Sequence, residues 1–262
     1  MAGNDRKAIV VQERDRHLFR ELSAMRVVDR EQAKVVAQFG SITRVNVRLL
    51  ALTRSGLLRR FFVGTSAGGK KALYALSTKG AELVGVSQRG LRRQHDQMLV
   101  ADFFVEHQLT INRVYCLLKY GSLPAGVTFH RWIAFHQPIV PKLRLIPDGY
   151  VELQTPSGMV SSFLEVDLGH ESRRVWKEKA RNYLQFALSG DYEREFSQKS
   201  FRVLVLANSE RRMLSIRKAV AASTEKIFWF ATLDSVHPER FLTPVWLRPK
   251  GEERQPFFRE TP

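Results

Sequence analysis

Two neighbouring stretches decide the fold predicted for the first third of the chain: Ala51–Arg60, ALTRSGLLRR, and Lys70–Val84, KKALYALSTKGAELV. Apolar residues recur at helical spacing before Gly56, which predicts a helix from about residue 41 to residue 55. Apolar runs then flank the glycine-containing segment 64–69, as in a two-stranded hairpin. The two stretches therefore predict a helix, a hairpin with a basic tip and a short closing helix.

The residues upstream predict two further helices. Leu18, Leu22 and Met25 fall at helical spacing, and Asp29 is a good N-cap for a helix that ends at Gly40. Three helices followed by a hairpin, with the wording quoted above, resemble the winged helix-turn-helix domains of bacterial regulators. The resemblance implies that the third helix enters the major groove of DNA and that the hairpin contacts phosphates.

Residue chemistry places a DNA-binding surface on the third helix and the hairpin, because arginine reads guanine edges and basic groups neutralise phosphates. The residues assigned to the recognition helix are Thr43, Arg44, Asn46, Val47 and Arg48. The hairpin residues assigned to phosphate contacts are Arg59, Arg60, Lys70 and Lys71. Small winged helices also dock onto proteins, so a surface that never meets DNA is the open alternative.

The charge of the chain favours a polyanionic partner. The 262 residues carry a formal net charge of +16, and residues 1–93 hold 19 Lys/Arg against 7 Asp/Glu. This asymmetry indicates double-stranded DNA as the partner of the basic N-terminal part, although a solvated basic surface would look the same. The single cysteine, Cys116, excludes a disulfide framework. No apolar run approaches the roughly 18 residues of a membrane span, so we expect a cytoplasmic protein without a membrane partner.

The remaining sequence predicts an α/β body, so the chain is α+β overall. A helix at Asp96–His107 is followed by a segment at 111–118 that fits helix or strand. Strands are expected at 129–135, 143–153, 160–168, 201–207 and 227–231, and helices at 171–189 and 210–222. This order predicts a central mixed sheet flanked by helices. With the basic link Gly85–Arg93 as the boundary, the predicted domains are residues 1–90 and 91–262.

Three carboxylates carry the chemical signal of the body. Glu165 and Asp167 alternate along one strand, so they share a face with Phe163, and Asp148 lies on the preceding strand segment. Buried carboxylates are costly unless they meet a cation. Mg²⁺ or Mn²⁺ would suit these oxygen ligands, which makes Asp148, Glu165 and Asp167 the candidate metal ligands.

The element order and these acids resemble the PD-(D/E)xK nuclease core. That resemblance implies two acidic metal ligands on adjacent strands and a lysine that helps to activate water. Here Asp167 occupies the usual lysine position, so the motif reads PD…ExD. Some nucleases of this type carry the lysine on the following helix, where Lys177 and Lys179 lie, and Lys179 is our candidate. The alternative is that one of these lysines merely neutralises the carboxylates.

As a whole, residues 10–210 resemble the replication-relaxation family of plasmid and mobile-element proteins. The features that carry the resemblance are ALTRSGLLRR, Gln94-His95-Asp96 with Ala101-Asp102, and Leu164–Glu171 (LEVDLGHE) followed by Glu178-Lys179 and Tyr183. His170 stands where the family tends to have threonine. The resemblance implies a role in plasmid replication or DNA relaxation.

Three hypotheses follow. The first is a DNA-binding replication or relaxation protein of a plasmid or mobile element whose C-terminal domain is a Mg²⁺-dependent DNA endonuclease with Asp148, Glu165, Asp167 and Lys179 as catalytic residues. The second is a non-catalytic replication or transcription regulator with a degenerate nuclease-like domain. The third is a protein-docking scaffold. The expected partners besides DNA are a second copy of the chain, paired through the helix Asp96–His107, and replication or mobilisation proteins.

Overall fold

The computed structural model describes residues 9–64, 68–87 and 98–258, with side chains from Phe104 onward in the last range. The chain divides into two compact units, residues 1–116 and 117–262, each of which combines helices with a β-sheet. The α+β class predicted from the sequence is therefore confirmed. None of the helices within the described ranges is long and apolar enough to cross a membrane.

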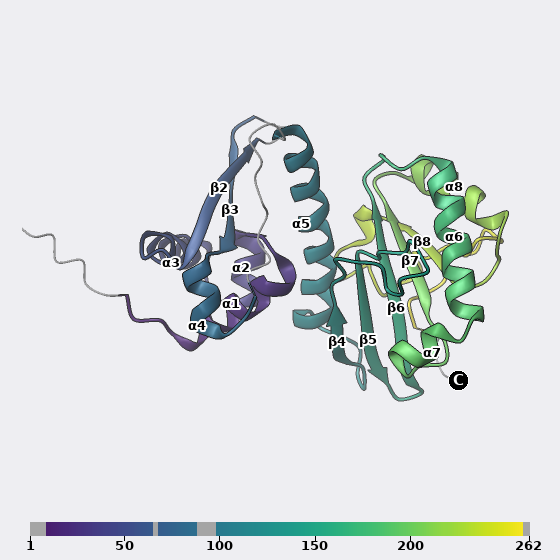
Figure 1. Cartoon of the computed structure of the whole chain (residues 1–262), viewed down its shortest axis with the longest axis horizontal. Coiled ribbons are helices and arrows are strands. Elements are labelled where there is room, and N and C mark those ends of the chain that lie inside the picture. Colours follow the sequence, from purple (N-terminus) through teal and green to yellow (C-terminus); the bar gives the residue numbers. More distant parts are fainter. Residues whose placement is uncertain (1–8, 65–67, 88–97, 259–262) are drawn as a thin grey trace, which may run out of the picture. The chain divides into compact units, whose positions relative to one another are not determined.

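The N-terminal unit places its helices around a small antiparallel sheet (Figure 1). The order is α1 (Glu13–Met25), β1 (Val28–Asp29), α2 (Arg30–Val36), α3 (Ile42–Arg54), β2 (Leu58–Gly64), β3 (Lys70–Leu76) and α4 (Thr78–Val84). The strand order is β1-β3-β2, so the short strand β1, which the sequence had not predicted, pairs with the outer edge of the β2–β3 hairpin.

Capping residues fix where the helices of this unit begin. The Asp29 side chain accepts a hydrogen bond from the Gln32 backbone N–H (2.8 Å), which confirms Asp29 as the N-cap of α2. Ser41 caps α3 in the same way, through the Arg44 backbone N–H. The buried stripe of α3, Leu49 included, then holds this helix against the core of the unit.

Helix α5 (Met98–Tyr120) is longer than the helix predicted at Asp96–His107, and it includes the segment 111–118 that fitted helix or strand. Polar contacts join α5 to the N-terminal unit. Asn112 donates to the backbone oxygens of Met25 (3.1 Å) and Val27 (2.6 Å), and Gln32 donates to that of Leu109 (2.7 Å). The units divide within α5, between Cys116 and Leu117. Part of the link that we predicted as a boundary lies outside the described residues.

The C-terminal unit contains a five-stranded sheet in the order β4-β5-β6-β7-β8. The strands are β4 (Thr128–Ile133), β5 (Gly149–Thr155), β6 (Gly158–Asp167), β7 (Arg202–Ala207) and β8 (Phe228–Thr232). The first three run antiparallel and the last three run parallel, so the predicted mixed sheet is present. The strand expected at 143–153 begins only at Gly149, because residues 144–147 before it have no regular structure and Pro147 cannot donate a backbone hydrogen bond to a strand ladder.

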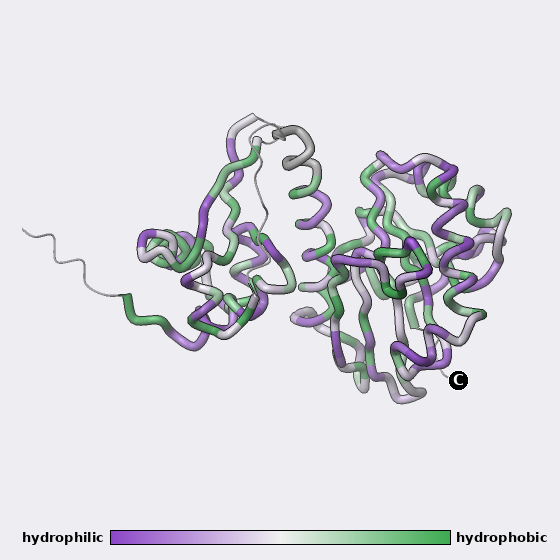
Figure 2. The backbone as a smooth tube through the Cα atoms, viewed as in Figure 1, coloured by the Kyte–Doolittle hydropathy of each residue, from purple (hydrophilic) through white to green (hydrophobic). Residues whose placement is uncertain are grey.

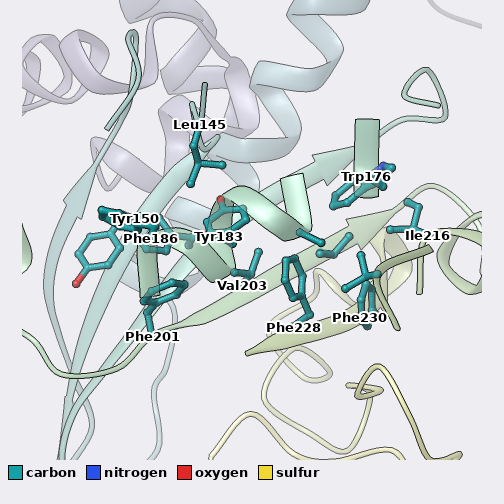
Figure 3. Packing of buried hydrophobic residues seen from close by; sticks show 14 of the residues in the cluster. Leu145, Tyr150, Trp176, Tyr183, Phe186, Phe201, Val203, Ile216, Phe228 and Phe230 are labelled. Atoms are coloured by element: carbon teal, nitrogen blue, oxygen red, sulfur yellow. The ribbon is translucent and has the colours of Figure 1, made fainter. Parts of the chain in front are cut away.

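Within the described residues, three α-helices and a short 3-10 helix follow in this unit: α6 (Arg173–Leu188), α7 (Asp191–Phe196), α8 (Glu210–Ala221) and η1 (Leu233–Ser235). Sequence analysis had not predicted α7. One face of the sheet packs against α6 and α8 through an aromatic core, in which Tyr183 and Phe186 of α6 meet Phe201 and Phe228 (Figure 3). In Figure 2 the strands are largely hydrophobic, whereas much of α6 is hydrophilic. This pattern leaves the outer side of the helices to solvent.

Candidate functional site

The exposed face of α3 contains most of the predicted recognition residues. Thr43, Arg44, Asn46 and Val47 are all exposed, and the Val47 side chain is an apolar group that is 66% exposed. Their spacing follows from the burial of Val45 and Leu49 on the opposite side of the helix. These four residues form a continuous outward surface.

Arg48, the fifth residue assigned to the recognition helix, is less exposed than these four and makes contacts within the unit. Its guanidinium Nε donates to Asp15 Oδ1 (3.0 Å), and its terminal nitrogen binds both Asp15 Oδ2 and the Val10 carbonyl. Asp15 is fully buried in α1, so its carboxylate needs this cation. The hydrogen bond with Asp15 raises the pKa of Arg48, whereas burial acts to lower it. The net result is a pKa above the ordinary value. Arg48 therefore holds α3 against α1.

The hairpin presents three of its four predicted basic residues to solvent. Arg59, Arg60 and Lys70 are exposed, and the Arg60 guanidinium lies 5.2 Å from the ring centre of the exposed Phe62. Lys71 forms an ion pair with the side chain of Asp29. The hairpin thus offers three cations to a partner, while Lys71 also binds within the unit.

The second candidate region lies between β6 and the helices that cover it. Glu165 and Asp167 both point toward α6, as the alternation along β6 predicted, and each is only 1% exposed. Glu165 accepts hydrogen bonds from the Lys179 ammonium (2.7 Å) and the Tyr183 hydroxyl (2.6 Å). Lys179 also pairs with Glu171 (2.8 Å). The structure therefore brings Lys179 onto Glu165, as the sequence suggested.

The pKa values of Glu165 and Lys179 are shifted from their ordinary values. Burial raises the pKa of Glu165 to about 7; Lys179 acts to lower it, and the nearby charge of Asp148 raises it further. Burial acts to lower the pKa of Lys179, but the charges of Glu165, Glu171 and Asp148 raise it above its ordinary value. Lys179 is consequently protonated at neutral pH, and Glu165 titrates near neutrality.

Asp167 belongs to a separate ion pair. Arg212 of α8 binds both of its oxygens (2.7 Å each), Trp176 donates to Oδ2 (2.9 Å) and the Gly169 backbone N–H donates to Oδ1 (2.7 Å). Although burial raises the pKa of Asp167, the hydrogen bonds from Arg212, Trp176 and Gly169 hold it below its usual value. Gly169 makes its contact at φ +103°, a conformation that favours glycine.

Asp148 lies immediately before β5, at its junction with β6. Its Oδ2 accepts a hydrogen bond from the Val166 backbone N–H (2.7 Å), so it sits beside the strand that carries Glu165. The next residue is Gly149, where an added Cβ would come within 2.3 Å of the Trp132 ring. The glycine lets β4 close over this position and keeps Asp148 against β6.

These residues do not fit the expected three-carboxylate metal site. Both oxygens of Glu165 and both oxygens of Asp167 already accept hydrogen bonds from protein groups. Among the described residues, no group of three or more His, Cys, Asp or Glu side chains is arranged to hold a metal ion. Asp148 and Glu165 offer carboxylate chemistry suited to Mg²⁺ or Mn²⁺, whereas Asp167 is neutralised by Arg212.

Sequence reasoning missed two partners of these acids. The hydroxyl of Tyr183 on Glu165 could have been found, because Lys179 and Tyr183 are four residues apart and share a helix face. Arg212 left no local signal, since it lies 45 residues after Asp167 on another helix. Only the parallel pairing of β6 with β7 brings the start of α8 to the end of β6.

The residues of this network coincide with the sequence features noted above, and the replication-relaxation family matches the chain over residues 19–198. The chain belongs to the replication-relaxation family. The matched range includes α3, the hairpin, Glu165 and Lys179, and it ends before β7. Membership supports a role in replication or relaxation. No curated protein and no solved structure matches the chain. The motif residues Gln94, His95 and Asp96 lie outside the described residues.

Proposed function

We propose that the protein binds double-stranded DNA through α3 and the β2–β3 hairpin, in the manner of a winged helix, as its part in replication or relaxation. The observation that carries the proposal is the exposed surface of α3 beside the cations of the hairpin. Among the described residues, no carboxylate lies within ion-pair distance of Arg44, Arg59, Arg60 or Lys70. Uncompensated cations on one surface are the electrostatic footprint of a phosphate-binding face.

A duplex-binding assay tests this proposal. The affinity of the full chain for a random-sequence 30-base-pair duplex is measured by fluorescence anisotropy across a salt series. The triple variant Arg44→Ala, Arg59→Ala and Arg60→Ala should bind more weakly. Its plot of log affinity against log salt should be shallower by about 2 to 3, because each lost phosphate contact removes about 0.9 from the slope.

A matched triple variant provides the control. Arg14, Arg20 and Arg30 are also exposed arginines of the N-terminal unit, but they lie on α1 and α2. Their replacement by alanine removes the same charge and should leave most of the affinity. Equal losses in both variants would mean that only net charge matters, and they would overturn the assignment of the surface.

A second candidate function is metal-dependent cleavage of DNA at Asp148, Glu165 and Lys179. The observation in its favour is the convergence of these groups, with Glu165 at a pKa near 7. In this function Asp148 and Glu165 would hold the divalent ion, which would supply charge stabilisation for the phosphodiester, and Lys179 would hold Glu165 in place. The competing interpretation is the non-catalytic regulator, which the internal pairing of each acid supports.

Supercoiled plasmid separates these interpretations. It is incubated with the protein and Mg²⁺ or Mn²⁺, and nicking is followed on a gel. Glu178 is an exposed acid of α6 and serves as the control. Nicking that is lost in Glu165→Gln and in Asp148→Asn but retained in Glu178→Gln supports cleavage. Intact plasmid with either metal leaves the non-catalytic regulator.

A further inference from the structure

The outer sides of α6 and α8 carry a second group of exposed basic side chains, which the average charge of this part of the sequence conceals. We call this group the α6/α8 band. Its members are Arg173, Arg174, Lys177, Arg181, Arg211 and Lys218. All six are exposed, so they form part of the surface of the C-terminal unit.

The two helices form one surface. They lie side by side on the same face of the sheet (Figure 1), and the Arg173 Nε donates to the Ser215 hydroxyl of α8 (3.0 Å). Trp176 and Tyr183 of α6 and Ile216 of α8 point inward to the core. The six band residues lie off this buried stripe and are exposed, so they point outward.

The cations of the band are not neutralised within the protein. Glu178 and Glu210 are the acidic residues of α6 and α8, and Glu210 pairs with Arg254 (2.7 Å) instead. The other cations of these helices bind internal groups, as Lys179 does with Glu165 and Arg212 with Asp167. In the described ranges, no carboxylate comes within ion-pair distance of any band residue.

Six like charges on two adjacent helices repel one another, and a polyanion relieves that repulsion. Arg174 and Arg181 are seven residues apart on α6, which places them about 10 Å apart along the helix axis. Duplex DNA presents phosphates densely enough to meet several such cations at once. We propose that the α6/α8 band is a second contact surface for the phosphate backbone of duplex DNA, separate from α3 and the hairpin. This inference rests on the proposed function for its ligand.

Salt-dependent binding of the full chain to the 30-base-pair duplex tests the proposal. The band variant combines Arg174→Ala, Lys177→Ala and Lys218→Ala. It should bind at least tenfold more weakly at 100 mM salt, with a salt slope shallower by about 2 to 3. The control variant removes one arginine and two lysines that lie elsewhere on the same unit: Arg194→Ala, Lys199→Ala and Lys250→Ala.

The outcomes distinguish the two proposals. If the band variant keeps the wild-type affinity and salt slope while the α3 and hairpin variant loses affinity, the band is not a DNA contact. The proposed function then still stands. A loss in the band variant alone supports the band and overturns binding through α3. Equal losses in the band and control variants overturn the band as a specific surface, and so does wild-type protein that binds no duplex at low salt.

A second readout observes the surface directly. Lysines of the full chain are acetylated with and without duplex, and the modified sites are quantified by mass spectrometry. Bound duplex should slow the acetylation of Lys177 and Lys218 severalfold and leave Lys199 unaffected. If Lys177 and Lys218 react equally with and without the duplex, the band makes no contact with it. If a single-stranded RNA or an acidic protein protects them and the duplex does not, the ligand assignment is refuted.

Discussion

Replacement of Arg212 by alanine should destabilise the C-terminal unit by about 3 kcal/mol. Asp167 is only 1% exposed and Arg212 holds both of its oxygens, so the substitution leaves a buried carboxylate without its counter-ion. Breaking a buried ion pair by removal of one partner costs about 3 to 5 kcal/mol. The Arg212 side chain is 18% exposed, so water can reach the vacated space and the lower end applies.

Tryptophan fluorescence in urea measures this effect selectively, because all four tryptophans of the chain lie in the C-terminal unit. In a thermal melt followed by the same fluorescence, a loss of about 3 kcal/mol should lower the melting temperature by about 6 to 12 °C for a unit of this size. Arg211→Ala is the control, since Arg211 is its exposed neighbour and should change stability by less than about 0.5 kcal/mol. Equal stability of the two variants would refute the reasoning.

The same assay separates the two roles considered for Asp167. As the partner of Arg212, Asp167 stabilises the fold, so Asp167→Asn should lower stability in metal-free buffer. If Asp167 were instead a metal ligand among other acids, its replacement would relieve the repulsion between them and raise stability in metal-free buffer. Mg²⁺ would then stabilise the wild type and not the variant. The structure favours the first outcome.

Two further predictions concern Glu165 and Arg48. Burial raises the pKa of Glu165 in the folded state from its ordinary value of 4.5 to about 7. The folded state therefore binds a proton that the unfolded state has already released between these two values. The free energy of unfolding of the wild type should fall by about 1 to 3 kcal/mol as pH rises from 4.5 to 7, and level off above pH 7. Urea titrations of tryptophan fluorescence between pH 5 and 8 should show this slope in the wild type and Glu178→Gln, but not in Glu165→Gln. Arg48→Ala should destabilise the N-terminal unit by about 3 kcal/mol, because it leaves the buried Asp15 carboxylate without its counter-ion. Circular dichroism in urea should detect this loss, whereas Arg44→Ala should unfold like the wild type.

Local rules predicted the elements of the N-terminal unit because each has its own signal. Ser41 and Asp29 cap helices as their side chains suggested, and Gly56 follows the end of α3. The strand β1 was missed because two residues, Val28 and Asp29, carry no periodicity of their own. They form a strand only because β3 offers an unpaired edge.

Side-chain partners were harder to predict than elements. Arg48 has the same sequence character as Arg44, yet one meets Asp15 and the other meets solvent. The difference depends on where α1 packs against α3, which helical periodicity does not encode. In the same way the acids of β6 shared a face as expected, but the identity of their cations depended on which helices cover that face.

By itself the sequence determined the α+β class, the order of most helices and strands apart from β1 and α7, the basic character of the N-terminal part, and the shared face of Glu165 and Asp167. These properties follow from nearest neighbours along the chain: apolar periodicity, caps, glycines and alternation in a strand. The tertiary structure alone decided that Arg212 neutralises Asp167, that Arg48 is an internal cation and that the basic residues of α6 and α8 form one surface. The physical reason is that ion pairs and surfaces are set by through-space distances between segments remote in sequence, and only the packing of the helices on the sheet fixes those distances.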